Sequence, residues 1–492
     1  MTPKNLIILM TDEMRADSAG FMGNPDCRTP HLDRFAAQGI VFENHFAVHG
    51  KCVPSRITMQ TGRYAHTDGF RTIHQHLPPG QPNLLQFLRE TCGYETAVFG
   101  INHTWEALFS TNEVGAGISD YHSFTGHYHE MAFAAYDSPA PGPDARLPLD
   151  LDPQHFHYRG RIEGPRPQFT DDARAAQAID YLTETRSREK PFYLHLNLTY
   201  PHPPYAVEEP YFSMYDRQTI RAWPYQLPEN APLPFRAMRE HRSGWETPEA
   251  AFREIQAVYY GMVTKVDTLL GRVLQTIEAQ GLLENSVVLF TADHGDFAGQ
   301  YGLVEKWDTC LNDCILHMPF ILWAPDLPHG ARVRELSEHV DLVPTLLDLL
   351  GLQKPREWGL HGQSLLPVIA GQPGKPAVFA DGGHEEEMWA RFNFESNQFA
   401  QLDGKQKTYR HIPEAMARTK MVRTQDWKLV MRLAGGNELY HLRDDPHELN
   451  NLWGRHLDDA ALLRVVLNLQ QKLIEWCLRT DTDRPYQEKV GA

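Results

Sequence analysis

Two pairs of metal-ligating side chains stand out in the sequence, Asp12-Glu13 and Asp293-His294. Each pair directly follows a short apolar run. Carboxylate oxygens favour a hard divalent cation, and calcium, magnesium and manganese all accept such ligands. Any one of these side chains alone could be a helix cap or a loop residue. The four together predict a metal site, with calcium as the first expectation and manganese or magnesium as alternatives.

A cysteine, Cys52, could supply a nucleophile. It follows the strand-like run Ile40-Val41-Phe42 and stands at the entry to a predicted helix. Backbone N–H groups at a helix N-terminus point outward and suit an anion. An isolated cysteine is more often a small buried hydrophobic residue. Position alone therefore leaves both interpretations open.

Four short apolar runs predict buried parallel strands, and each ends abruptly in polar residues. These runs are Asn5–Met10, Thr96–Gly100, Phe192–Leu198 and Ser286–Phe290. They are too short for most helices and are separated by helical stretches. Ligands of open α/β sheets bind outside the carboxyl ends of the strands. We therefore expect the two metal-ligating pairs, together with His103 and His202, to meet at one edge of one sheet.

Apolar residues at helical spacing predict the helices between these strands. The predicted helices are 83–91, 170–185, 248–280 and 341–352. The pattern predicts an α/β fold. Two long segments, 105–168 and 206–247, lack periodicity and are rich in Pro, His, Tyr and Phe. Long aperiodic insertions are usually functional loops, so we expect them to shape the substrate pocket.

A stretch rich in Pro and Gly precedes residue 373, where we place a domain boundary. Short strand-like runs and an amphipathic helix over 458–479 follow it. The predicted domains are a catalytic α/β domain, 1–372, and a C-terminal α+β subdomain, 373–492, with a small antiparallel sheet.

Composition excludes several classes of partner. The chain has 492 residues and a formal net charge of −16, which disfavours nucleic acid and anionic membranes. No apolar run reaches the roughly 18 residues of a membrane helix. The apolar run near the N-terminus is too short for a signal peptide. The six cysteines are scattered, as in reduced proteins. We therefore expect a cytoplasmic protein without a membrane or nucleic-acid partner, and a homo-oligomer stays open.

The strongest local pattern is Cys52-Val53-Pro54-Ser55-Arg56, followed by Thr61-Gly62-Arg63. It resembles the signature of the sulfatase family of the alkaline-phosphatase superfamily. Further motifs of that family follow in order over essentially the whole chain except the two insertions. They are Gly93-Tyr94-x-Thr96, Gly100-x-x-His103, Pro201-His202-x-Pro204-Tyr205, Asp293-His294-Gly295 with Lys306, Asp341-Leu342-x-Pro344-Thr345, Gly362-x-Ser364-Leu365-Leu366-Pro367, Trp427-Lys428-Leu429 and Glu438-Leu439-Tyr440.

The resemblance implies a fold and a cofactor. The fold would be alkaline-phosphatase-like, a large mixed, mostly parallel sheet flanked by helices, with the smaller C-terminal sheet and helix. A maturase, the formylglycine-generating enzyme, would oxidise Cys52 to formylglycine. Residue 52 would also bind the metal. One hydroxyl of the hydrated aldehyde attacks sulfur, and the other lets the resulting ester collapse. The implied activity is hydrolysis of an aryl or sugar sulfate monoester.

The resemblance also implies roles for four residues around the sulfate group. Arg56 would hold the formylglycine against the metal, and His103 would orient or deprotonate its hydroxyl. His202 or Lys306 would protonate or neutralise the leaving oxygen. Such groups stabilise the charge that moves to that oxygen in the transition state.

The chain departs from the family pattern at two places. The lysine usual in Gly-Lys-x-His is Ile101 here, which removes a cation from the pocket. Lys51, Arg71 and His74 are candidates to replace it, and each could equally be solvated surface charge. Glu13 is the second departure, because the family commonly has Asp or Gln there, and its coordination is less secure than that of Asp12.

Two alternative functions stay open. One is a phosphonate monoester hydrolase or phosphodiesterase of the same superfamily, although such relatives tend to carry Tyr and Thr at the positions of Ile101 and His103. The other is a catalytically silent sulfatase-like binding protein, and the missing lysine is the reason to retain this alternative.

Overall fold

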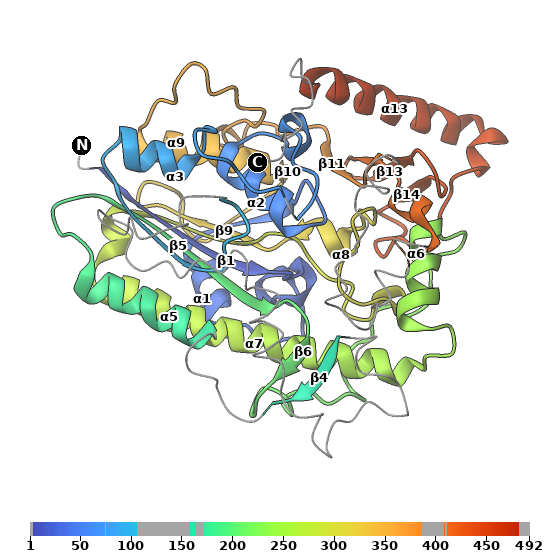
Figure 1. The fold of residues 1–492 in the computed structure, drawn as a ribbon, viewed down its shortest axis with the longest axis horizontal. Coiled ribbons are helices and arrows are strands. Elements are labelled where there is room, and N and C mark those ends of the chain that lie inside the picture. The colour runs from blue at the N-terminus through green and yellow to red at the C-terminus, as the bar shows by residue number, and fades with distance from the viewer. Residues whose placement is uncertain are drawn as a thin grey trace, which may run out of the picture.

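The centre of the molecule is a mixed, mostly parallel sheet (Figure 1). The computed structural model describes residues 3–73, 75–105, 157–162, 171–385, 408 and 411–481. Strand order in the large sheet is β10-β2-β9-β7-β1-β5-β3, with β8 paired to β2. The strands are β1 (Asn5–Asp12), β2 (Ile40–Phe46), β3 (Glu95–Gly100), β5 (Phe192–Pro201), β7 (Ser286–Ala292), β8 (His317–Met318), β9 (Phe320–Trp323) and β10 (Ala331–Glu338).

Four neighbouring strands, β3, β5, β1 and β7, are parallel, as the four apolar runs predict. Strand β9 runs antiparallel to both of its neighbours, which makes the sheet mixed. Every residue of β1 and β7 is buried, so these central strands need apolar side chains on both faces. The carboxyl ends of the four parallel strands lie at one edge and deliver Asp12, His103, His202 and Asp293 there.

Helices cover both faces of the large sheet (Figure 1). Alternation along β1 places Ile7 and Leu9 in one core cluster and Leu6 and Ile8 in the other. The first cluster takes side chains from α1 (Pro30–Gln38), α5 (Asp171–Asp180) and α7 (Glu249–Ala279). The second takes them from α2 (Cys52–Thr61), α3 (Leu84–Gln86) with its π-helical continuation Phe87–Thr91, and α9 (Leu342–Leu350). None of the helices in the described ranges is both long and apolar enough to span a bilayer.

A separate antiparallel sheet lies in the C-terminal part of the chain. Its strands follow in the order β11 (Val378–Gly382), β12 (Thr419–Arg423), β13 (Trp427–Arg432) and β14 (Glu438–His441). Helix α13 (Ala460–Thr480) packs on it through Val466, Leu469, Leu473 and Trp476. The predicted fold class is therefore confirmed: a large mixed sheet flanked by helices, with a smaller antiparallel sheet and a helix. The domain boundary near residue 373 stays a prediction.

The two predicted insertions meet where the structure describes them. Strand β4 (Tyr158–Arg161) belongs to the first and pairs with β6 (Tyr205–Val207) at the start of the second. The second also holds α6 (Leu233–Met238) and a π-helical segment, Arg239–Ser243. Two short helices, α8 (Asp313–Leu316) and α10 (Leu366–Ile369), lie further along the chain. Most of the first insertion lies outside the described residues, and its contribution to the pocket stays a prediction.

The end of β3 depends on a glycine that lets two strands approach closely. Gly100 has φ +98°, and a Cβ built there would lie 1.7 Å from the carbonyl oxygen of Asn197 on β5. Any side chain would push β3 away from β5 just before His103. Gly93 also has a positive φ, +73°, but a Cβ there would meet no atom within 4 Å.

These two glycines give a matched test of the strand contact. Gly93→Ala should lower the free energy of unfolding by about 1 kcal/mol, the cost of a positive φ for alanine. Gly100→Ala should lower it by at least ~2–4 kcal/mol, because overpacking adds to that cost. Urea unfolding of both variants measures the difference. Equal losses would mean that the β3–β5 contact relaxes freely.

Candidate active site

One arginine connects the two carboxylates at the sheet edge. Arg56 on α2 donates from Nε to Asp293 Oδ2 at 2.7 Å and from Nη2 to Asp12 Oδ2 at 2.9 Å. All three side chains are at most 2% exposed. Burial alone would raise the pKa of Asp12, but Arg56, with His202 and Lys306, lowers it below its usual value. The arginine therefore keeps Asp12 ionised inside the protein.

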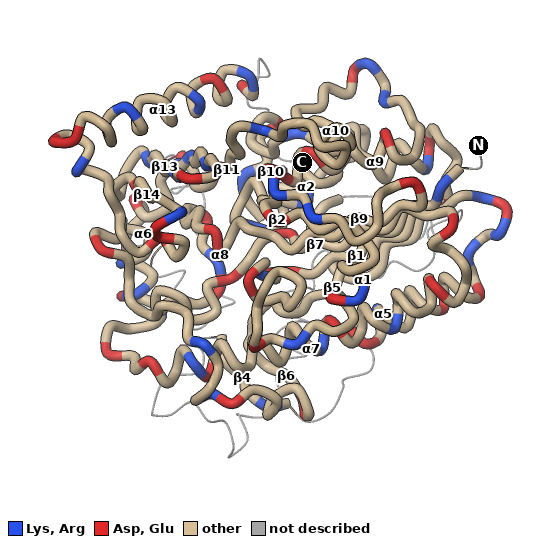
Figure 2. Tube along the Cα trace, turned by 180° about the vertical axis from the view of Figure 1, so that it is seen from behind, with Lys and Arg blue, Asp and Glu red and all other residues tan. Residues whose placement is uncertain are grey.

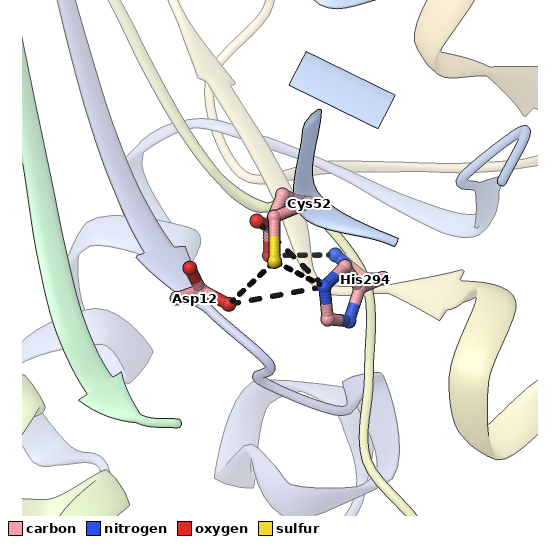
Figure 3. Close-up of side chains that lie close together, drawn as sticks. Asp12, Cys52 and His294 are labelled. Carbon is pink, nitrogen blue, oxygen red and sulfur yellow. Dashed lines mark hydrogen bonds and ion pairs between the residues drawn. The ribbon is translucent and has the colours of Figure 1, made fainter. Parts of the chain in front are cut away.

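The first residue of α2, Cys52, lies on the same side of the helix as Arg56, one turn earlier. Its Sγ is 3.2 Å from His294 Nε2 and 3.8 Å from Asp12 Oδ1 (Figure 3). Burial, with Asp12 and Asp293 nearby, raises the pKa of the Cys52 thiol well above its usual value. An unmodified Cys52 is therefore a protonated thiol and a poor nucleophile.

His294 is held in the tautomer that a metal ligand needs. Its Nδ1 lies 2.9 Å from the carbonyl oxygen of Gly295, which can only accept, so Nδ1 carries the proton. The lone pair on Nε2 then faces Cys52 and Asp12 (Figure 3). Gly295 lets the chain approach α8, because a Cβ there would lie 2.1 Å from the Cys314 carbonyl oxygen.

The residues at this edge fit a divalent cation. Ligand atoms of Asp12, Cys52, Asp293 and His294 all lie within 4.8 Å of one another, and all four residues are buried. Arg56 compensates one of the two carboxylates and leaves one negative charge. Two carboxylates with an imidazole whose lone pair faces inward suit calcium, manganese or magnesium, and the donor set does not select among them.

Glu13 lies outside this four-residue group. Its Oε1 contacts Lys306 Nζ, and it lies 3.1 Å from His202 Nε2. Glu13 has φ +66°, and its carbonyl oxygen accepts a hydrogen bond of 2.7 Å from Tyr259 on α7. This turn directs the carboxylate toward Lys306. Glu13, Asp12 and His202 form a second group of possible ligands, which shares Asp12 with the first. The structure thus places Glu13 in this second group and not in the four-residue group.

His202 and Lys306 form one unit above the carboxylates. His202 Nδ1 donates to the Pro203 carbonyl oxygen, so its Nε2 accepts a hydrogen bond from Lys306 Nζ at 2.8 Å. Lys306 is 3% exposed, whereas the His202 side chain is 18% exposed. The lysine is thus fixed inside the site, and the histidine stands between it and solvent.

His103 follows β3 and completes the set of predicted site residues. Its Nδ1 is 3.8 Å from Asp12 Oδ2, and its side chain is 16% exposed. Burial, followed by the charges of Arg56 and His202, lowers the pKa of His103 well below its usual value. His103 is therefore neutral at pH 7 and able to accept a proton.

The candidates to replace the missing lysine have other partners. Lys51 Nζ lies 2.8 Å from Asp308 Oδ1, and Arg71 contacts Glu385. His74 lies outside the described residues. Ile101 is buried, at 3% exposure. Of the two described candidates, Lys51 is the nearer to Cys52 in sequence, but its charge is balanced by Asp308.

Two supporting residues were not singled out in the sequence analysis. Asn197 on β5 accepts a hydrogen bond of 3.3 Å from Arg56. Ser55 donates to the Asp293 carbonyl oxygen at 2.6 Å and lies 3.1 Å from His339 Nδ1. Asn197 could have been noticed as a polar residue within the strand-like run Phe192–Leu198. Nothing in the local sequence indicates that His339 contacts Ser55.

Comparison with known proteins identifies relatives along nearly the whole chain. The family model described as Sulfatase matches residues 4–352. The multifunctional alkaline phosphatase superfamily protein PehA of Trinickia caryophylli is 27% identical, over 97% of this chain and 96% of that protein. Arylsulfatase K of Danio rerio is 25% identical, over 96% and 87%. The N-acetylglucosamine-6-O-sulfatase of Bacteroides thetaiotaomicron is 24% identical, over 92% and 83%.

Solved structures show the same fold. The phosphonate monoester hydrolase of Agrobacterium radiobacter has a TM-score of 0.72 and 23% identity, over 97% of this chain and 96% of that one. A protein solved in complex with its substrate D-glucosamine-2-N,6-O-disulfate has a TM-score of 0.72 and 21% identity, over 97% and 98%.

The metal site can be tested at Asp293. Asp293→Asn should lower the bound divalent metal at least ~10-fold, because it removes one of two carboxylates from a hard-cation site. Elemental analysis of the purified protein measures metal content, and the rise in melting temperature on adding calcium or manganese gives a second readout.

Asp267→Asn is the matched control. Asp267 is equally buried and accepts hydrogen bonds from the N–H groups of His31 and Leu32, at the start of α1. This variant should keep its metal. Unchanged metal content in Asp293→Asn would remove Asp293 from the ligand set.

Proposed function

The chain belongs to the sulfatase family, and we propose that it hydrolyses the ester bond of a sulfate monoester with a nucleophile made from Cys52. The position of Cys52 Sγ carries this proposal. It lies at the helix N-terminus, within reach of His294 and Asp12 and one turn before Arg56. A sulfuric ester hydrolase needs its nucleophile beside a cation, an anion-binding helix N-terminus and metal ligands, and Cys52 has all three as neighbours.

Formylglycine at residue 52 and one divalent metal are the proposed cofactors. Asp12, Asp293, His294 and residue 52 would hold the metal, calcium before manganese or magnesium. A hydrated aldehyde at residue 52 would supply two hydroxyls, one to serve as the nucleophile and one to release the product, and the metal would supply positive charge beside them. Because Cys52 is only 3% exposed, a maturase would have to act before folding is complete.

The chain's own residues would manage the proton and the charge. Neutral His103 is proposed to accept the proton from the residue 52 hydroxyl. Arg56 holds Asp12 and Asp293 apart at fixed positions and keeps residue 52 beside them. His202 and Lys306 are proposed to face the leaving oxygen, where Lys306 can stabilise negative charge. His202, the more exposed, can deliver a proton once its Nε2 is protonated and no longer accepts the hydrogen bond from Lys306. Glu13 would keep the Lys306 ammonium in place, as its direct contact suggests.

The proposed substrate is an aryl or sugar sulfate. Relatives named as arylsulfatase and as N-acetylglucosamine-6-O-sulfatase support both classes. A phosphonate monoester or phosphodiester is the second candidate. It is supported by the phosphonate monoester hydrolase that shares this fold, and Ile101, which departs from the lysine of the sulfatase pattern, is compatible with it.

The nucleophile can be tested by mass and by turnover together. Conversion of cysteine to formylglycine lowers the intact mass by about 18 Da, as sulfur is replaced by oxygen and two hydrogens are lost. Cys52→Ala should lack this change and retain less than ~1% of kcat/KM, because removing a covalent nucleophile costs far more than a positioning group. Cys92→Ala, at a half-buried cysteine outside the site, should keep both.

The substrate class is read from the same protein sample. Nitrophenyl sulfate, nitrophenyl phenylphosphonate and a nitrophenyl phosphodiester release the same nitrophenolate. Differences among their kcat/KM values therefore report the preference of the site for the sulfate, phosphonate or phosphodiester group. We expect the sulfate to be the best substrate. A higher kcat/KM on the phosphonate would support the second candidate. Complete conversion of Cys52 to formylglycine without turnover of any ester would favour the silent binding protein.

The roles of His202 and Lys306 can be separated by the leaving group. A sugar alkoxide needs protonation as it departs, whereas a nitrophenolate hardly does. His202→Ala should therefore lower kcat/KM at least ~10-fold more on a sugar sulfate than on nitrophenyl sulfate. Lys306→Ala should lower both, because a cation near the sulfate also contributes to binding. Equal losses for His202→Ala on the two substrates would make it an anion-positioning residue.

A further inference from the structure

Helix α13 is apolar on two faces. Val466, Leu469, Leu473 and Trp476 face the C-terminal sheet. A second set is exposed: Leu463 at 40%, Leu467 at 55%, Ile474 at 60% and Leu478 at 74%. At 3.6 residues per turn the exposed set falls within a sector of about 60°, roughly 130° from the buried face. We call these four residues the outer stripe.

The outer stripe is on the periphery of the molecule. Figures 1 and 2 show α13 along an outer margin, and the exposure of its members means that no described segment covers them. The last eleven residues, 482–492, contain only two large apolar side chains, Tyr486 and Val490, and so are poorly matched to it. Four exposed aliphatic side chains aligned on one side of a helix indicate an interaction site.

The spacing of the outer stripe is symmetric. Leu463 and Leu478 have their midpoint between Gln470 and Gln471, and Leu467 and Ile474 have the same midpoint. A helix with this pattern matches a second copy of itself in the antiparallel direction. Leu463 would then face Leu478 of the second copy, and Leu467 would face Ile474 of the second copy.

The charges beside the outer stripe are arranged about nearly the same centre, because the midpoint of Arg464 and Glu475 lies one residue before the midpoint of the stripe. Arg464 and Glu475 both lie on one flank, about 70–90° from the centre of the stripe. In an antiparallel helix pair the same flanks of the two helices face each other. Arg464 of one copy would therefore lie within about one helical turn of Glu475 of the other, twice per dimer. Figure 2 shows both signs of charge along α13, which suits self-association better than an anionic membrane.

We propose that the outer stripe of α13 is a homodimer interface, with two α13 helices antiparallel about a two-fold axis between Gln470 and Gln471. Four aliphatic side chains from each copy leave water, and two Arg464–Glu475 pairs fix the register. The buried face is turned roughly 130° from the stripe, so in each copy the body of the protein lies away from the contact. A two-fold, self-complementary contact is the commonest form of oligomer.

Sedimentation of the full chain at micromolar concentration tests this proposal. The wild type should have twice the 56.3 kDa mass of one chain. Leu467→Glu and Ile474→Glu should each weaken association at least ~100-fold, because a charge is placed at the centre of the apolar contact. Asn468→Glu, one residue away but off the stripe, is the matched control and should stay dimeric. All three should keep wild-type helix content and turnover.

A charge swap tests the antiparallel register. Arg464→Glu alone and Glu475→Arg alone should each weaken association, because each places like charges opposite one another. The double variant should regain it, since the pairs form again with reversed signs. Failure of the double variant to recover would overturn this register.

Two further results would overturn the interface itself. One is a wild type that is monomeric at micromolar concentration, whether or not it binds phosphatidylcholine–phosphatidylserine vesicles in flotation. The other is a dimer that Leu467→Glu and Ile474→Glu leave intact, which would place the contact elsewhere.

Discussion

The guanidinium of Arg56 bridges the carboxylates of Asp12 and Asp293, and the rest of the site depends on this contact. These carboxylates end neighbouring strands, β1 and β7, and neither is exposed. Without the guanidinium, two buried like charges would lie side by side, at a cost of several kcal/mol. The same contact draws α2 against the sheet edge, and Cys52, one turn before Arg56, is placed by it. The position of Cys52, the proposed nucleophile, is thus a consequence of charge compensation in the interior.

Charge balance explains why this edge suits a metal. The carboxylates of Asp12, Asp293 and Glu13 outnumber the cations that contact them, Arg56 and Lys306, by one. Such a site would repel an anionic ester. A divalent cation among Asp12, Asp293 and His294 reverses the sign and makes anion binding favourable. In the proposed mechanism the chain would therefore supply geometry and proton transfer, and the net positive charge would come from the ion.

Much of this could be predicted from the sequence, because the strands carry their own signal. Short apolar runs ending in Asp or His define both the elements and the edge where they meet, and an unbroken apolar run such as Leu6–Leu9 indicates a strand that is covered on both faces. The direction of Glu13 could not be predicted. It depends on a positive φ and on Tyr259, which is far away in sequence. The pairing of Lys51 with Asp308 is likewise a long-range contact without local pattern.

Ile101 and Glu13 together bear on the charge of the substrate. The first puts an apolar side chain where the sulfatase pattern has a cation, and the second engages Lys306 through its carboxylate. The missing lysine leaves the anion pocket less positive than the family pattern implies, and Glu13, which has the same charge as the Asp common at its position, offsets the charge of Lys306. Sulfate monoesters, phosphonate monoesters and phosphodiesters each carry one negative charge, whereas a phosphate monoester carries nearly two at neutral pH. A pocket with little spare positive charge discriminates against the dianion, because the second charge would be desolvated without a partner. The two departures are therefore compatible with either proposed substrate class, and they disfavour phosphate monoesters.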